Sequence, residues 1–200
     1  VAGADVAEGK AAEGTGGGNY SVLKILDVTN PREVFRFRAR CGFDTFYKAC
    51  DKWGRHYNNA LLAVECNAIG EAIMTGLKDV TFYPNLYAEK KETRAIGRQV
   101  EGKIGWRTTT KNKGEIVSLL SQALQGESED DDHHFQPDFL VRDEVLLAEA
   151  LSFENRDGIL GAAVGKHDDD VLATAIAHRM FMDLRRQVAR TGAPSIIIGP

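Results

Sequence analysis

The twenty residues 20–39, YSVLKILDVTNPREVFRFRA, decide the fold of this chain. Apolar side chains alternate through residues 20–28, and phenylalanine alternates with arginine in residues 34–39. This period of two predicts two β-strands. The sequence Thr29-Asn30-Pro31 between them predicts a turn. Residues 1–6 form a further short apolar strand, so we expect three consecutive strands in an antiparallel meander.

The next segments predict a helix, a buried strand and another helix. Residues 43–56 carry apolar side chains at helical spacing, with Asp44 as the expected N-cap. The continuous apolar run 60–66 predicts a buried strand parallel to its neighbour. Residues 68–77 then predict a helix and residues 81–87 a strand.

The resulting order β-β-β-α-β-α-β is typical of a ribonuclease H-like domain. The predicted fold class is therefore α/β, with a mixed β-sheet flanked by helices. The rest of the chain predicts further helices over residues 110–124, 142–153 and 168–190.

Composition excludes several classes of protein. The chain has 200 residues, of which 43% are hydrophobic and 27% charged, which is ordinary for one globular domain. A net charge of -4 argues against a protein that binds DNA by electrostatic attraction alone. Cys41, Cys50 and Cys66 lack CxxC spacing, which argues against a zinc site or disulfide framework. The sequence contains no run of 18 apolar residues, so it predicts no transmembrane helix.

Three acidic positions stand out because a carboxylate is costly there. Asp5 ends the first strand, Glu65 ends the buried apolar strand, and Asp168 and Asp169 open the last helix. An ionised carboxylate in an apolar setting must be paired or must coordinate a metal. Two strand ends and a helix N-terminus can converge on one point. Two Mg²⁺ or Mn²⁺ ions bound there could bridge a scissile phosphate.

Each of these residues also has a structural interpretation. Asp5 precedes a glycine-rich segment and could form an Asx turn, and Glu65 could close its strand by pairing with an arginine. The aspartates 168–170 could serve as ordinary helix capping residues. Residue types alone leave both interpretations open.

Two other segments and one cysteine are weaker candidates. The glycines of 14–18 lack the pattern of a phosphate-binding loop and predict a turn. The run 130–134, DDDHH, predicts a solvated loop, because consecutive side chains cannot all face one ion. Cys66 has no identifiable base beside it and is interpreted as a buried thiol.

Residues 78–113 form a locally basic segment. They include nine basic and four acidic residues, a net charge of +5 in an acidic chain. We expect contact with phosphates without sequence reading; the alternative is a solvated hairpin. The predicted DNA-binding residues are Arg94, Arg98, Lys103, Arg107, Lys111 and Lys113.

Five motifs, in this order, resemble those of a known family. They are Gly3-Ala4-Asp5-Val6-Ala7-Glu8-Gly9, Asn19-Tyr20-Ser21-Val22, Val64-Glu65-Cys66-Asn67, Gly105-Trp106-Arg107-Thr108-Thr109 and His167-Asp168-Asp169. Together they resemble the C-terminal nuclease domain of the large terminase subunit of tailed bacteriophages, over residues 1–180.

The resemblance implies a metal-dependent endonuclease that cuts concatemeric viral DNA during genome packaging by a two-metal mechanism. It implies Asp5, Glu65 and Asp169 as catalytic metal ligands, with Asp168 as an adjacent ligand and His167 close by. Mg²⁺ or Mn²⁺ would be the cofactor. Many relatives carry Asp at the position of Asn19, which implies a weaker ligand here.

The resemblance also implies a setting. The chain begins at Val1, inside a strand, so we expect residues 1–200 to be a single nuclease domain excised from a longer chain with an N-terminal ATPase domain. The implied partners are double-stranded DNA, that ATPase domain, the portal and the small terminase subunit, in the cytoplasm of an infected bacterium and with no membrane. Alternatives are a Holliday-junction resolvase, a hybrid nuclease, or a non-catalytic module that docks DNA or protein.

Overall fold

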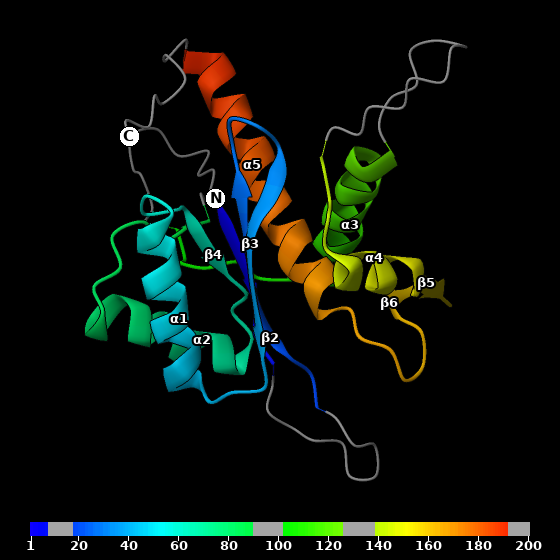
Figure 1. Ribbon diagram of the computed structural model, residues 1–200, viewed down its shortest axis with the longest axis horizontal. Coiled ribbons are helices and arrows are strands. Elements are labelled where there is room, and N and C mark those ends of the chain that lie inside the picture. Colours follow the sequence, from blue (N-terminus) through cyan, green and yellow to red (C-terminus); the bar gives the residue numbers. More distant parts are fainter. Residues whose placement is uncertain (8–17, 90–101, 126–138, 192–200) are drawn as a thin grey trace, which may run out of the picture.

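A four-stranded sheet forms the centre of the molecule (Figure 1). The computed structural model describes residues 1–7, 18–89, 102–125 and 139–191. The strands are β1 (Ala2–Asp5), β2 (Ser21–Asp27), β3 (Arg32–Ala39) and β4 (Leu62–Val64), in the order β3-β2-β1-β4. β2 pairs antiparallel with both β1 and β3, whereas β4 pairs parallel with β1. The predicted meander and mixed sheet are confirmed.

Helices cover both faces of this sheet (Figure 1). On one face lie α1 (Phe43–His56), α2 (Ala68–Thr75) and the π-helical turn η1 (Gly76–Val80). On the other lie α3 (Thr110–Gln125) and the long α5 (Asp169–Thr191). The short α4 (Glu144–Leu151) and the hairpin of β5 (Phe153–Arg156) and β6 (Ile159–Ala162) lie near the start of α5. No helix in the described ranges is long and apolar enough to cross a bilayer.

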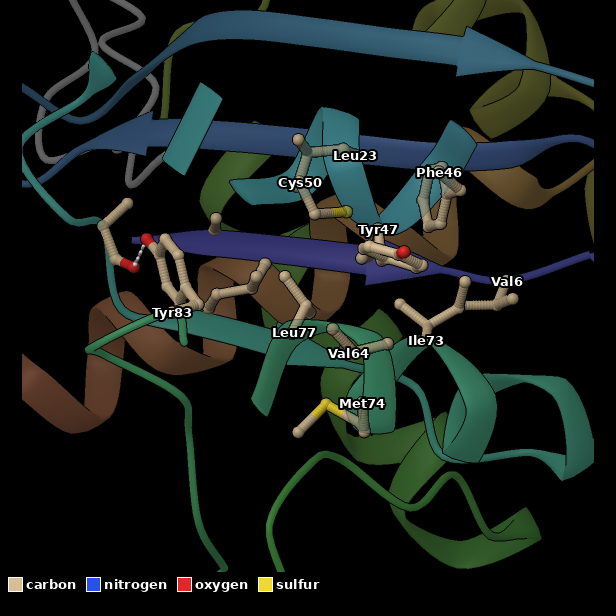
Figure 2. Packing of buried hydrophobic residues seen from close by; sticks show 14 of the residues in the cluster. Val6, Leu23, Phe46, Tyr47, Cys50, Val64, Ile73, Met74, Leu77 and Tyr83 are labelled. Carbon is tan, nitrogen blue, oxygen red and sulfur yellow. Dashed lines mark hydrogen bonds between the residues drawn. The ribbon is translucent and has the colours of Figure 1, made fainter. Parts of the chain in front are cut away.

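The core between the sheet and α1 follows from the alternation in the strands. Leu23 and Val64 face Phe46, Tyr47 and Cys50 of α1, as Figure 2 shows. Ile73, Leu77 and Tyr83 complete this cluster, and the Tyr83 hydroxyl donates a hydrogen bond to the Ala60 carbonyl at 2.6 Å. Each large apolar side chain buried in this way contributes about 1.5–3 kcal/mol.

On the opposite face α5 packs directly on the backbone of β1. Gly3 has no side chain, and a Cβ built there would lie 2.3 Å from the Ala173 carbonyl oxygen and 2.5 Å from the Ala177 nitrogen. Small residues on both elements therefore allow the helix to lie against the strand. This contact places the first turn of α5 at one end of the sheet.

Two local predictions were wrong. Gly42, not Asp44, is the N-cap of α1, and Asp44 lies in its first turn. Residues 81–87 form no strand; only an isolated bridge joins Leu86 to Leu62. Phe82 adopts a left-handed φ of 51° and Pro84 lacks a backbone donor, so a ladder cannot form there. The helix predicted over 142–153 is confirmed as α4, Glu144–Leu151, and β5 begins at Phe153.

Candidate metal centre

Two of the predicted carboxylates lie at the same end of the sheet. Asp5 is the last residue of β1, and Glu65 directly follows β4. These strands are parallel with Ala4 opposite Val64, and the Glu65 N–H donates to the Ala4 carbonyl at 2.9 Å. The side chains of Asp5 and Glu65 form a hydrogen bond with each other. Parallel register therefore brings together two acids that are far apart in sequence.

The turn after Glu65 is fixed by hydrogen bonds of the backbone and of the Asn67 side chain. The Trp106 N–H donates to the Val64 carbonyl at 2.8 Å, which ties a distant segment to the end of β4. Asn67 caps α2 by accepting a hydrogen bond from the Gly70 N–H at 2.8 Å, and its amide donates to the Val6 carbonyl at 2.8 Å. Because Asn67 bonds next to both strand ends, it holds them together.

The third carboxylate comes from the first residue of α5. The Asp169 Oδ2 accepts a hydrogen bond from the Tyr20 N–H at 3.1 Å. It also lies 3.4 Å from the His167 Nδ1 and 3.9 Å from the Arg38 Nη2. The preceding Asp168 lies 3.4 Å from the Lys113 Nζ. His167 thus lies beside Asp169, and its role in a metal site stays a prediction.

The carboxylates perturb one another. The pKa of Asp5 is raised well above its usual range, first by burial, then by the hydrogen bond and charge of Glu65, and by the charges of Asp169 and Asp168. Burial also raises the pKa of Asp169 to about 6, against the opposing effect of the Tyr20 N–H. These four acids therefore share one electrostatic environment.

A divalent cation fits the chemistry of these donors. Asp5 is only 7% exposed, and no described lysine, arginine or histidine forms an ion pair with Asp5 or Glu65. A buried carboxylate without a cationic partner is costly. The donors are all hard oxygens, the type that Mg²⁺ and Mn²⁺ prefer. Even so, no three His, Cys, Asp or Glu side chains of the described ranges form a ready-made cation site.

Asp170 belongs to a different environment. Its carboxylate contacts Lys24 at 3.0 Å and Arg36 at 2.6 Å, and it also pairs with Arg38. Burial acts to raise its pKa, but the hydrogen bond from Arg36 and the charge of Lys24 outweigh burial and lower it. Of the aspartates 168–170, this one has a structural role.

Sequence reasoning missed three residues that surround Asp169. They are Tyr20, Arg38 and the buried Glu149 of α4. The sequence did contain a signal for Arg38. Arginines alternate with core phenylalanines in β3, so the arginine side chains lie on the opposite face of the sheet, toward a second layer of side chains. Glu149 gave no such signal, because its environment depends on how α4 packs against α5.

The described members of the predicted DNA-binding set differ in their surroundings. Arg94 and Arg98 lie outside the described residues, and Lys103 and Lys111 are exposed. Arg107 pairs with Glu71 at 3.0 Å. Only Lys113, among those described, contacts one of the candidate metal ligands.

Cys66 and two loop segments were the weaker candidates of the sequence analysis. Cys66 is half-buried, and burial raises the pKa of its thiol, which disfavours the reactive thiolate. The segments 14–17 and 130–134 lie outside the described residues.

Comparison with solved structures supports the predicted fold. The large terminase nuclease of thermophilic phage G20c with bound magnesium is 17% identical, with a TM-score of 0.61 over 89% of this chain and 79% of that one. The same nuclease with bound cobalt gives 15% identity and a TM-score of 0.61 over the same shares. The nuclease domain of the large terminase of Thermus phage P74-26 gives 17% and 0.55, over 88% and 76%. No protein-family model and no curated protein matched the sequence. The ribonuclease H-like fold, and the resemblance to these nucleases at the level of fold, are confirmed.

Proposed function

We propose that this chain is a metal-dependent DNA endonuclease that cuts concatemeric viral DNA during genome packaging by a two-metal mechanism. One observation carries the proposal. Asp5 and Glu65 lie on adjacent parallel strands without a cationic partner among the described residues, and the charges of Asp168 and Asp169 act on the same carboxylate. A salt-bridge role for Asp5 or Glu65 would require a basic partner, and the hydrogen bond between the two carboxyl groups exists only while one of them is protonated.

Asp5, Glu65 and Asp169 would hold Mg²⁺ or Mn²⁺, with Asp168 as an adjacent ligand. Such cations supply an activated water for hydrolysis of a phosphodiester and neutralise charge on the leaving oxygen. The parallel register orients Asp5 and Glu65, and the Tyr20 N–H orients Asp169. Lys113, which lies beside Asp168, would contact a phosphate of the bound strand.

The fold supports the proposed role in viral genome packaging. Solved nucleases of large terminases share it, and one of them contains magnesium. By this analogy the partners would be double-stranded DNA, an N-terminal ATPase domain of the same protein, the portal and the small terminase subunit. The reaction would then take place in the cytoplasm of an infected bacterium.

The test is nicking of supercoiled plasmid by the wild type, Asp5→Asn and Asp44→Asn, with Mn²⁺, Mg²⁺, Ca²⁺ or EDTA. Asp44 is exposed on α1, on the opposite face of the sheet from α5, and serves as the matched control. We expect the wild type and Asp44→Asn to nick DNA with Mn²⁺ or Mg²⁺, and Asp5→Asn to be inactive. Equal nicking by Asp5→Asn would refute the site. Preference for a four-way junction or an RNA–DNA hybrid over plasmid would refute the packaging substrate.

A further inference from the structure

Glu149 links α4 to the first turn of α5. Its Oε2 accepts hydrogen bonds from the Asp170 N–H at 2.7 Å and the Val171 N–H at 3.3 Å. The first N–H groups of a helix have no acceptor within that helix. Glu149 therefore caps α5 from another helix, and its side chain is only 7% exposed.

Arg38 joins this cap to Asp169. Its Nη1 donates to the Glu149 Oε1 at 2.6 Å and also contacts Asp170, while its Nη2 lies 3.9 Å from the Asp169 Oδ2. The guanidinium lies 4.0 Å from the ring centroid of Tyr20, whose N–H holds Asp169. Arg38 therefore contacts the capping residue Glu149, the ring of Tyr20 and, at longer range, Asp169 itself.

We propose that Glu149 and Arg38 are positioning residues for the metal centre. Glu149 fixes the start of α5 and Arg38 fixes Glu149, so that Asp169 is held in place before a cation binds. This inference rests on the proposed function. Residues that orient metal ligands in this way change metal affinity by about 10–100-fold when they are replaced.

Glu33 provides a matched control within the same layer of charges. It pairs with Lys24 at 2.9 Å, and its side chain is 11% exposed. Its ion pair with Lys24 does not involve Arg38, Asp169 or the N–H groups of α5. Replacing it removes a buried charge of the same type without touching the cap. If Glu149 had only a structural role, replacing Glu149 or Glu33 would lower stability alike, and neither substitution would change metal affinity.

The experiment measures Mn²⁺ affinity by calorimetry for the wild type, Glu149→Ala, Glu149→Gln and Glu33→Gln, at a temperature where circular dichroism shows each to be folded. We expect the dissociation constant to rise about tenfold in Glu149→Ala. Glu149→Gln keeps an oxygen acceptor for the two N–H groups and should recover most of the affinity. Glu33→Gln should bind Mn²⁺ like the wild type, even where its melting temperature falls as far as that of Glu149→Gln.

Two results would overturn the inference, and they differ. Wild-type Mn²⁺ affinity in Glu149→Ala and Glu149→Gln would remove the positioning role and leave the proposed function intact. A wild type that binds no Mn²⁺ and cuts no plasmid would overturn the proposed function and the positioning role with it.

Discussion

Asp169 and Asp170 are consecutive residues whose pKa values move in opposite directions. Burial raises the pKa of Asp169 to about 6, whereas Arg36 and Lys24 overcome burial and lower that of Asp170. One aspartate thus faces the acidic cluster and the next faces a basic layer. At the start of α5, the candidate metal ligand Asp169 is therefore followed directly by Asp170, which forms structural ion pairs.

The raised pKa of Asp169 predicts a pH-dependent loss of stability in the metal-free protein. An unfolded aspartate has a pKa near 3.9, so the folded state binds this proton more tightly than the unfolded state. The stabilisation is complete below about pH 4 and is lost as pH rises through about 6, which amounts to about 3 kcal/mol. Urea unfolding in EDTA at pH 5 and pH 7.5 measures the loss. We expect Asp169→Asn to show a smaller difference between the two pH values, and an equal difference would contradict the assignment.

The same titration predicts how metal affinity depends on pH. A carboxylate must lose its proton to bind a cation. We expect Mn²⁺ binding to weaken below about pH 6 and to release protons there. Calorimetry in two buffers with different ionisation enthalpies measures the protons released. An affinity that stays constant from pH 5 to 7.5 would show that Asp169 does not bind the ion.

Asp170→Ala should destabilise the protein strongly. The substitution removes a buried carboxylate from Lys24 and Arg36, and Lys24 is fully buried. Both keep Asp143 as a partner and Lys24 also keeps Glu33, so we expect a loss at the lower end of the range of about 3–5 kcal/mol that is typical of breaking a buried ion pair. Asp44→Ala, in an exposed pair with Lys48, should cost less than about 0.5 kcal/mol. Chemical denaturation compares the two, and similar losses would mean that the buried layer contributes little.

Gly3→Ala should destabilise the contact between β1 and α5. The added Cβ would lie 2.3 Å from a backbone oxygen, which cannot move without shifting the helix. Overpacking of this kind costs about 1–3 kcal/mol. Gly114→Ala is the control, because its Cβ would lie 3.4 Å from Leu160, and alanine favours a helix by up to about 1 kcal/mol. A melting temperature for Gly3→Ala at or above that of the wild type would show that α5 lies farther from β1.

Lys113→Ala should weaken DNA binding. Gel-shift titration in Ca²⁺ over a range of salt concentrations tests this, and loss of one phosphate contact lowers the salt slope by about 1. Lys48→Ala, on α1 across the sheet, should bind DNA like the wild type. An unchanged slope for Lys113→Ala would assign Lys113 to its pair with Asp168 alone.

The sequence predicted the strands of the meander because their side chains alternate between two buried layers. It also predicted α1 over Phe43–His56, because one apolar stripe follows the helical period. The false strand over 81–87 shows the limit of this reasoning. Tyr83 is buried there and Leu86 packs against the same core, but a left-handed Phe82 and Pro84 prevent pairing.

The candidate site could be predicted only in part. Asp5 and Glu65 were found because they end apolar strands, and Asp169 because it opens a helix. The parallel register that joins the first two depends on pairing between distant segments. Glu149 and Arg38 act through contacts between α4, α5 and β3, and no local pattern in the chain encodes such contacts.

The absence of a side chain at Gly3 also affects how this protein can change over time. Because α5 lies on the main chain of β1, the spacing between the acids at their ends is set by backbone atoms. A side chain at position 3 would change that spacing, so we expect it to be the least tolerant position of β1 in a saturation mutagenesis screen for folded protein.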